Sequence, residues 1–416
     1  MRTDVTGLCG LYDNAWLIDG VRTPFAEFNG VLGAISPTDM GIKVAREAFR
    51  RSGLAPADVD AVFAGNMAQS SFDVFVLPRH VGLYSGVPLE VPAVMAQRVC
   101  GTGFELIKQA ADGIRLGQIS LGLCVGTESM TRNPVSAYTH RGGFRMGQVE
   151  FKDFLWEALR DTAPDTTMGG TAENLAKKYK LERREVDAFA AQSFERAIAA
   201  QKDGFLDGEI VPVVSESFEL PGYHTRGIKL SSRIAEFRSD DHVRPSPPEV
   251  LAKLKPAFGG VQTGGNSSGL VDGAAAALVA STEYVRAKGL KPLARVAASA
   301  VVGVQPELMG IGPAPAIRLL VDRAGLKLEQ IDRFEINEAF GAQCLAVERE
   351  LRIDHAKLNV NGGAIAIGHP LAATGVRLTV TLARELRRRG LRYGISSACI
   401  GGGQGIALLI ENPDAR

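Results

Sequence analysis

The chain has 416 residues, of which 45% are hydrophobic and 22% charged, as in an ordinary globular protein of two or three domains. The formal net charge is +1, so we expect binding to neither nucleic acid nor a membrane. Five cysteines form no disulfide framework at this length, and no cysteine or histidine shows metal-ligand spacing. The first fourteen residues resemble no signal peptide, and no apolar run approaches the ~18 residues of a membrane span. We therefore expect a cytoplasmic protein without a metal site.

The first third of the chain alternates strand and helix patterns. Apolar runs typical of strands cover residues 15–20, 59–64 and 121–127, and residues 91–95 form a shorter one. Pro37 begins a predicted helix that Gly53 ends. This order predicts an α/β fold, in which helices cover a parallel or mixed sheet.

Cys100 lies at the start of a predicted helix. Apolar residues recur at helical spacing between about Gly101 and Leu116. The free N–H groups and the positive end of the helix dipole favour a thiolate there, and the thiolate is the nucleophilic form of cysteine. The alternative is a buried structural cysteine, since free cysteine is among the most buried residue types.

From Thr131 to about Gly265 the chain is more polar and richer in Arg, Asp, Pro and Gly. Helices are predicted at residues 172–179 and 183–202. We interpret this stretch as an inserted loop domain because aromatic residues are available to anchor it to the core. These anchors are Phe151, Phe154, Trp156, Phe189 and Phe194.

An internal repeat relates the two ends of the chain. Residues 53–60 resemble residues 325–332, with Gly53 and Asp60 matching Gly325 and Asp332 at a constant offset of 272. The apolar run 272–281 has a counterpart at 405–410. We therefore predict two similar α/β halves around the inserted domain. Their limits are residues 1–130, completed by 271–291, then 131–270 for the insertion, and 292–416 for the second half.

Three stretches of the second half carry residues suited to chemistry. Asn337 ends a predicted strand, His369 follows a glycine-rich loop and precedes a helix, and Cys399 ends a strand before the glycine turn 401–405. Each has a structural alternative: a helix cap, a turn histidine, a packed cysteine or a tight turn. The turn 401–405 matches neither a P-loop nor a dinucleotide fingerprint.

Taken together, these residues suit acyl transfer. Cys100 can form a thioester, His369 can take the thiol proton, and Cys399 can move a proton at a carbon centre. Asn337, through a water, and His369 can donate to one oxyanion, and the backbone N–H groups of Cys100 and near Gly401 can donate to another. A carbon–carbon bond made or broken between two acyl thioesters needs two such oxyanion sites, one for a tetrahedral species and one for an enolate.

Four motifs resemble the signature sequences of the thiolases: Cys-Gly-Thr-Gly at 100–103, Asn-Glu-Ala-Phe at 337–340, Gly-Gly-Ala-Ile-Ala-Ile-Gly-His-Pro at 362–370 and Cys-Ile-Gly-Gly-Gly-Gln-Gly at 399–405. The resemblance covers roughly residues 15–411. It implies a five-layered αβαβα fold built of two βαβαβαββ halves with an inserted loop domain, in a homodimer or homotetramer.

The resemblance also implies roles for single residues. Cys100 would be the acylated nucleophile, His369 its base and Cys399 the acid and base at the second carbon. Asn337 would hold the oxyanion-hole water. Ser268 and Arg244 lie where the family contacts coenzyme A, which is a substrate here, and no metal or redox cofactor is implied.

Thr167 bears on the choice of substrate. Short-chain biosynthetic thiolases, the acetyl-CoA C-acetyltransferases, carry a histidine at this position near the acyl pocket, so the resemblance favours a 3-ketoacyl-CoA thiolase of fatty-acid breakdown. Two further alternatives are a decarboxylating or initiating condensing enzyme and an inactive relative that binds acyl-CoA. Cys399 argues against the first, and the intact set of Cys100, His369 and Cys399 argues against the second.

Overall fold

A mixed sheet of eleven strands carries the molecule. The computed structural model describes residues 5–69, 71–138 and 140–415, so residues 1–4, 70 and 416 of the predicted halves and residue 139 of the predicted insertion lie outside the described residues. The strand order is β17-β18-β19-β16-β2-β15-β6-β4-β5, with β1 beside β16 and β3 beside β15. Only two residue pairs join β16 to β2, so the sheet consists of two parts that meet along one short edge.

The helices and strands of the two parts follow the predicted alternation. The first part contains β2 (Ala15–Arg22), β3 (Ala26–Glu27), α1 (Pro37–Ser52), β4 (Ala61–Gly65), α2 (Leu77–Tyr84), β5 (Ala93–Met95), α3 (Thr102–Arg115), β6 (Leu121–Glu128), β15 (Val271–Ser281) and α8 (Thr282–Ala287). The second contains β1 (Gly7–Leu11), β16 (Ala294–Gly303), α9 (Pro313–Arg323), β17 (Arg333–Ile336), α10 (Gly341–Leu351), α11 (Ala364–Ile367), α12 (Leu371–Arg389), β18 (Tyr393–Ile400) and β19 (Gln404–Glu411).

Local signals set several of these limits. The Ser36 hydroxyl accepts a hydrogen bond from the Thr38 N–H at the start of α1, and Gly53 ends the helix with a φ of +70°. The helix predicted after Cys100 is α3, and the helix predicted after His369 is α12. These predictions are confirmed.

The two parts repeat one arrangement. The Asp60 carboxylate accepts hydrogen bonds from the Ser120 and Leu121 N–H groups, at 2.7 and 3.0 Å. Asp332 accepts equivalent bonds from the N–H groups of residues 392 and 393, at 2.9 and 3.0 Å. The two sets of donors and acceptors are therefore related by the same offset of 272 residues. In both parts the strand after the aspartate pairs in parallel with the strand of the donors: β4 with β6, and β17 with β18. The repeat found in the sequence is therefore a structural repeat, while the predicted domain limits stay a prediction.

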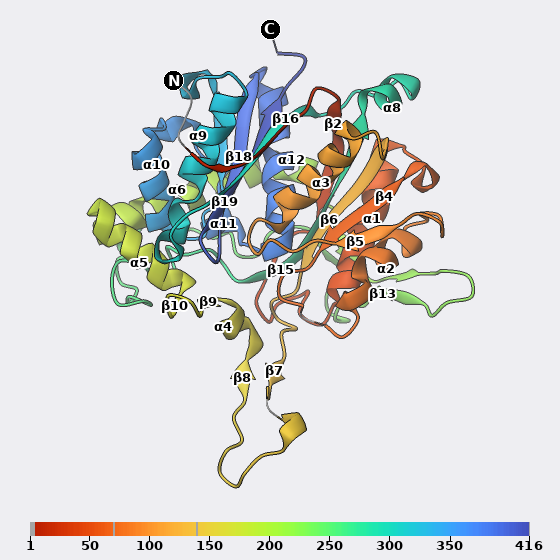
Figure 1. Cartoon of the computed structure of the whole chain (residues 1–416). Helices are drawn as coiled ribbons and strands as arrows, with labels where there is room; N and C mark the ends of the chain where they lie inside the picture. The colour runs from red at the N-terminus through yellow and green to blue at the C-terminus, as the bar shows by residue number, and fades with distance from the viewer. Residues whose placement is uncertain (1–4, 70, 139, 416) are drawn as a thin grey trace.

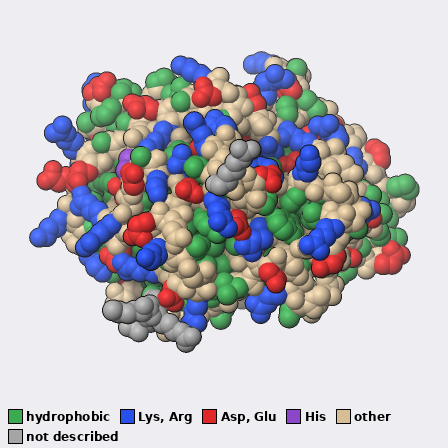
Figure 2. All heavy atoms as spheres, turned by 90° about the horizontal axis from the view of Figure 1, so that it is seen from above, with side chains coloured by type: hydrophobic (Ala, Val, Ile, Leu, Met, Phe, Trp, Pro, Cys, Tyr) green, Lys and Arg blue, Asp and Glu red, His purple; other side chains and the backbone are tan. Residues whose placement is uncertain are grey.

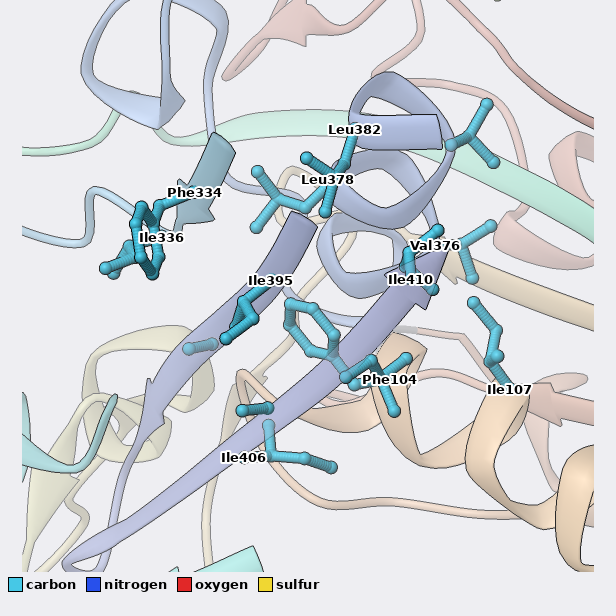
Figure 3. Packing of buried hydrophobic residues seen from close by; sticks show 14 of the residues in the cluster. Phe104, Ile107, Phe334, Ile336, Val376, Leu378, Leu382, Ile395, Ile406 and Ile410 are labelled. Atoms are coloured by element: carbon cyan, nitrogen blue, oxygen red, sulfur yellow. The ribbon is translucent and has the colours of Figure 1, made fainter. Parts of the chain in front are cut away.

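Helices and sheets alternate in layers (Figure 1). The outer helices α1 and α2 pack on the first part of the sheet, and α9 packs on the second. Between them, α3 and α12 contact each other and both parts of the sheet. Apolar side chains of α3 and α12 point toward those of β17, β18 and β19 in this middle layer (Figure 3).

Glycines let α3 and α12 cross closely. A Cβ at Gly103 would lie 2.6 Å from the Val376 nitrogen, and one at Gly375 would lie 2.2 Å from the Phe104 nitrogen. Real Cβ atoms do not approach that closely, so both positions require glycine. The crossing lies near the N-terminal ends of both helices, and Cys100 and His369 directly precede those ends.

Residues 7–14, to which the sequence assigned no element, extend the sheet. Strand β1 pairs antiparallel with β16 over five residues. The Tyr12 hydroxyl donates to Asp112 on α3 (2.8 Å) and shares a hydrogen bond with Ser299 on β16 (2.8 Å). This segment therefore links the far end of α3 to the sheet.

The described residues between 131 and 270 add no strand to the eleven-stranded sheet, and their short strands pair with one another. Their elements are β7 (Val135–Ser136), β8 (Lys152–Asp153), α4 (Phe154–Ala158), β9 (Arg160–Asp161), β10 (Thr166–Thr167), α5 (Met168–Tyr179), α6 (Arg183–Lys202), β11 (Val213–Val214), β12 (Glu216–Phe218), β13 (Arg226–Ile228), β14 (Glu236–Phe237) and α7 (Pro248–Leu251). The pair β7 and β8 begins an arm that projects from the body of the molecule (Figure 1).

The aromatic anchors predicted for this region are correct only in part. Phe189 and Phe194 are buried in α6. Phe151 and Trp156 are 67% and 56% exposed, so the prediction that they anchor the region is wrong. Phe151 directly precedes β8 in the arm, and Trp156 lies in α4, which follows β8, so neither side chain packs in the core.

Candidate active site

A cavity of about 310 Å³ contains both Cys100 and His369. Its wall comes from the two sheet-bearing parts and from the inserted region, and most of it is apolar. The lining residues are Cys100, Met130, Trp156, Leu159, Thr167, Met168, Gly169, His242, Ala257, Phe258, Thr263, Gly264, Ser267, Ser268, Gly269, Leu270, Met309, Ala339, Phe340, His369 and Leu371.

A strained turn presents Cys100 to the cavity. Val99 has a φ of +45°, which is costly for a β-branched residue and persists only where the surrounding structure enforces it. The Thr102 hydroxyl enforces it here, donating to the Val99 carbonyl (2.7 Å) and accepting from the Arg98 N–H (2.9 Å). Cys100 follows this turn one residue before the cap of α3.

The Cys100 thiol is protonated at neutral pH. Burial raises its pKa to about 11, and the N–H groups of Gly401 and of Cys100 itself offset that rise only in part, while the Glu128 carboxylate adds to it. The prediction that the helix start favours a thiolate is therefore wrong for the free protein, because desolvation outweighs the N–H groups. Nucleophilic attack by this sulfur would require a base to take the proton first.

His369 is held as a neutral imidazole. Its Nδ1 lies 2.6 Å from the Thr374 hydroxyl, which donates to the Pro370 carbonyl (3.1 Å), so Nδ1–H is the donor. Its Nε2 then accepts from the Asn337 carboxamide nitrogen at 3.2 Å. Burial, and secondarily the positive charge of Arg377, lower the pKa of His369 to about 3. The imidazole is therefore neutral at pH 7 and able to accept a proton on Nε2.

Asn337 lies directly after β17, where its N–H donates to the Ser397 carbonyl of β18 at 2.9 Å. Its side chain is fully buried, and its carboxamide oxygen has no hydrogen-bond partner among the described residues. Asn337 neither caps nor begins a helix, because α10 starts only at Gly341.

Cys399 lies behind the cavity wall. It is fully buried and packs with Met168, Met309 and Ala339, all three of which line the cavity. Burial raises the pKa of the Cys399 thiol well above its usual range, and Cys100 raises it further. Cys399 is the last residue but one of β18, and Gly401 follows in the turn, where its N–H group bonds to the Cys100 thiol.

The two residues predicted to contact coenzyme A differ in position. Ser268 lines the cavity. Arg244 does not line it: its guanidinium is half-exposed and forms an ion pair with Glu27 at 2.7 Å. His242, two residues earlier, does line the cavity and bonds to the same Glu27 carboxylate at 2.8 Å.

Sequence reasoning missed three residues of the site: His242, Thr374 and Glu128. Thr374 lies five residues after His369, in the first turns of α12. The only signal in the sequence was the predicted helix start between the two residues, which places them close together. Glu128 ends β6 and accepts N–H groups from Met67, Ala68 and Ala372, at 3.1 Å each. The nearly continuous apolar run before Glu128 pointed to a buried strand end, but not to its partners.

Within the described ranges, no three histidine, cysteine, aspartate or glutamate side chains come together as a metal ion would require. The arrangement instead places a thiol, a neutral imidazole, a carboxamide and a second thiol around one largely apolar cavity. Such a set is suited to covalent catalysis with proton transfer.

Comparison with known proteins finds matches along most of the chain. A family model described as the thiolase N-terminal domain matches residues 15–283, and the thiolase C-terminal domain matches residues 290–412. The chain is 43% identical over 406 residues to the mitochondrial 3-ketoacyl-CoA thiolase of Bos taurus, covering 97% of this chain and 99% of that one. It is 42% identical over 398 residues to an acetyl-CoA acetyltransferase of Pseudomonas aeruginosa, covering 95% and 98%.

A solved structure is similar throughout. Human mitochondrial 3-ketoacyl-CoA thiolase in complex with CoA superposes with a TM-score of 0.90 at 41% identity, covering 98% of this chain and 100% of that one. The α/β fold predicted from the sequence is confirmed by this match.

Proposed function

Because this chain belongs to the thiolase family and is a thiolase acyltransferase, we propose that it cleaves 3-ketoacyl-CoA with free coenzyme A through an acyl-enzyme on Cys100. The products are acetyl-CoA and a shortened acyl-CoA, and the reverse reaction is a Claisen condensation. The observation that carries the assignment of residues is the shared cavity of Cys100 and His369, with Asn337 bonded to the imidazole.

In the cleavage direction His369 takes the Cys100 proton, and the sulfur attacks the 3-keto carbon. The carbon–carbon bond breaks, and Cys399 protonates the carbon of the departing acetyl-CoA enolate. The N–H groups of Cys100 and Gly401 stabilise the tetrahedral oxyanion, while His369 and a water held by Asn337 stabilise the enolate. The thiol of a second coenzyme A then gives its proton to the Cys399 thiolate and removes the acyl group from Cys100, whose sulfur takes back the proton held by His369.

The resting protonation states set what the substrate has to change. Burial raises the pKa of the Cys100 thiol to about 11 and lowers the pKa of the His369 imidazole to about 3, so both groups are neutral at pH 7 and proton transfer between them is uphill in the free protein. In the bound substrate, negative charge develops on the oxygen that the N–H groups of Cys100 and Gly401 face. Catalysis then depends on groups that are already positioned.

The preference for 3-ketoacyl substrates longer than acetoacetyl rests on the cavity wall. Thr167 lines the cavity where a larger histidine occurs in the short-chain enzymes, and the rest of the wall is largely apolar. The second candidate is a short-chain acetyl-CoA C-acetyltransferase, favoured by the near-equal similarity to the Pseudomonas aeruginosa enzyme.

One assay series tests the proposal and separates the two candidates. Thiolysis is followed with acetoacetyl-CoA and with 3-ketoacyl-CoA esters of increasing chain length. A higher kcat/KM for the longer esters supports the 3-ketoacyl-CoA thiolase, and activity restricted to acetoacetyl-CoA supports the acetyltransferase. Absence of thiolysis with every ester refutes both and leaves the inactive acyl-CoA-binding relative.

Substitution of the nucleophile tests its role. Cys100→Ser is expected to keep the fold and lose nearly all turnover, and Cys399→Ser to form the acyl-enzyme without exchanging the carbon–carbon bond. Cys9→Ser is the matched control, because Cys9 lies on β1 away from the cavity. Iodoacetamide should label Cys100, and bound acyl-CoA should prevent this labelling. Wild-type turnover in Cys100→Ser would contradict the mechanism.

We further propose that Ser268 and Arg244 contact coenzyme A and that the protein is a homodimer or homotetramer. The exposed apolar side chains of the arm support self-association: Tyr138, Phe144, Met146, Val149 and Phe151. On the face opposite the arm, basic and acidic side chains are interspersed (Figure 2). Arg244→Gln should raise the KM for coenzyme A with little change in kcat, and light scattering on the full chain should give a mass of two or four copies.

A cytoplasmic location is also proposed. All five cysteines are free thiols, which suits a reducing compartment. No helix in the described parts of the chain has the length and apolar character needed to cross a lipid bilayer. Cell fractionation tests the location directly.

A further inference from the structure

We propose that Glu338 is a positioning residue for acyl transfer: its buried carboxylate holds the loop that leads to His369 against the strand end that carries Asn337. The inference rests on the proposed function, because it takes Asn337 and His369 to act on the substrate. Glu338 itself does not line the cavity and touches no reacting atom.

Both oxygens of the Glu338 carboxylate are occupied. Oε1 accepts the Asn359 carboxamide N–H at 2.8 Å. Oε2 accepts the Ser193 hydroxyl at 2.6 Å and the Ile365 backbone N–H at 3.1 Å. The donors come from α6 in the inserted region, from Asn359 in the loop after α10 and from Ile365 in α11, so one side chain ties three segments together.

The loop is shaped around this carboxylate. A Cβ at Gly363 would lie 2.0 Å from the Glu338 Cδ, so a side chain at this position would displace the carboxylate. The Gly363 N–H donates to the Ser193 hydroxyl at 3.1 Å, which makes the hydroxyl a bridge between loop and carboxylate. Asn359 also bonds both backbone groups of Ile336, at 2.8 and 2.9 Å, directly before Asn337.

These contacts lie at both ends of the bond between Asn337 and His369. Asn337 precedes Glu338 in the chain, and only three residues separate Ile365 from His369. The carboxylate therefore sets the position of the loop relative to the strand, and with it the 3.2 Å separation of the carboxamide nitrogen and Nε2. A displacement of about 1 Å between reacting groups can lower a rate about 10²-fold.

A purely structural role is the competing explanation. A buried carboxylate with three donors contributes to folding, and its removal leaves those donors unpaired. That explanation predicts lost stability without a specific change in turnover. The two explanations therefore differ in kcat measured on folded protein.

The test compares Glu338→Gln with Asp332→Asn in the full chain. Glu338→Gln keeps the shape of the side chain but places a carboxamide NH₂ group where a carboxylate oxygen accepted hydrogen bonds. We expect kcat to fall ~10- to 100-fold while the KM for 3-ketoacyl-CoA stays within ~3-fold of wild type. Asp332 is the matched control, since it lies just before β17, at the far end from Glu338, and its carboxylate also accepts two N–H groups. Asp332→Asn should lose stability and keep the wild-type kcat.

Two results overturn the proposal. One is a kcat within twofold of wild type in folded Glu338→Gln, and the other is an equal loss of kcat in Asp332→Asn at equal loss of stability. If Glu338→Gln does not fold, Ser193→Ala removes a single donor, and an unchanged kcat in that variant likewise overturns the proposal. A coupling of the Ser193→Ala and Glu338→Gln effects on kcat in a double-mutant cycle supports it.

A further readout keeps this inference separate from the proposed function. The ¹⁵N resonances of the His369 ring report its tautomer and hydrogen bonds without any turnover. They should shift in Glu338→Gln and stay unchanged in Asp332→Asn; unshifted resonances in Glu338→Gln contradict the positioning role. An inactive wild-type chain with no thiolysis of any ester refutes the function alone.

Discussion

The crossing of α3 and α12 allows a sharp prediction for Gly103→Ala. The added Cβ would lie 2.6 Å from the Val376 nitrogen and 2.8 Å from both the Ala372 oxygen and the Gly375 nitrogen. Ordinary contact begins at 3.4 Å, and all three atoms are backbone, so the helices must separate by about 0.8 Å. No side-chain rotation can relieve the overlap.

Both stability and turnover should respond. Overpacking of this kind costs about 1–3 kcal/mol, because the layers on either side of the helix pair are close-packed. The helix starts carry Cys100 and His369 into the cavity, so a shift approaching 1 Å should lower kcat by about 10²-fold or less. The free energy of unfolding is measured by urea titration, and kcat by thiolysis of a 3-ketoacyl-CoA.

Gly113→Ala on the same helix is the matched control. Its Cβ would meet only the Ile119 side chain, at 3.2 Å, and that side chain can move. Alanine is favoured over glycine within a helix by up to about 1 kcal/mol, so this variant should be as stable as the wild type or more so and fully active. A Gly103→Ala protein with wild-type stability and wild-type kcat would refute the argument that the glycine crossing positions the two side chains.

Three further predictions concern buried charges and protonation. Arg22→Met should lower the free energy of unfolding, measured by urea titration, by about 3–5 kcal/mol, because it leaves Glu209 and Asp240 buried without their partner. Arg50→Met breaks an ion pair of an exposed arginine and should change the free energy of unfolding by less than about 0.5 kcal/mol. Equal effects of the two substitutions would contradict the reasoning. With a thiol pKa of about 11, alkylation of Cys100 by iodoacetamide should rise with every pH unit from 7 to 9, and a plateau within that range would show a lower pKa. The pKa of His369 is lowered from 6.5 to about 3 in the folded protein, so between pH 6.5 and pH 3 only the unfolded chain takes up this proton. The free energy of unfolding should therefore fall as the pH drops toward 3. His369→Asn should show a shallower fall, and identical pH profiles of the two proteins would exclude this contribution.

The sequence by itself determined those features that depend on neighbours along the chain. The cap of α1 by Ser36 and Gly53 is a local interaction, and so is the helical periodicity after Cys100. The offset of 272 residues was visible because a duplicated arrangement keeps its turn and strand-start residues, and Asp60 and Asp332 make the same contacts. Three of the four motifs combine a reactive side chain with glycines that bring the backbone close, and the fourth, at 337–340, contains no glycine.

Only the tertiary structure decided what depends on burial and on distant partners. Desolvation by segments far apart in the chain reversed the expected ionisation of Cys100. The pairing of β1 with β16 joins residues nearly 300 positions apart, for which a five-residue strand carries no local signal. The arm exposed Phe151 and Trp156, the fold turned His242 rather than Arg244 into the cavity, and Glu338 gained donors from α6 and from the loop before His369. Period and composition describe a residue's own segment, whereas free energies of burial depend on every segment packed around it.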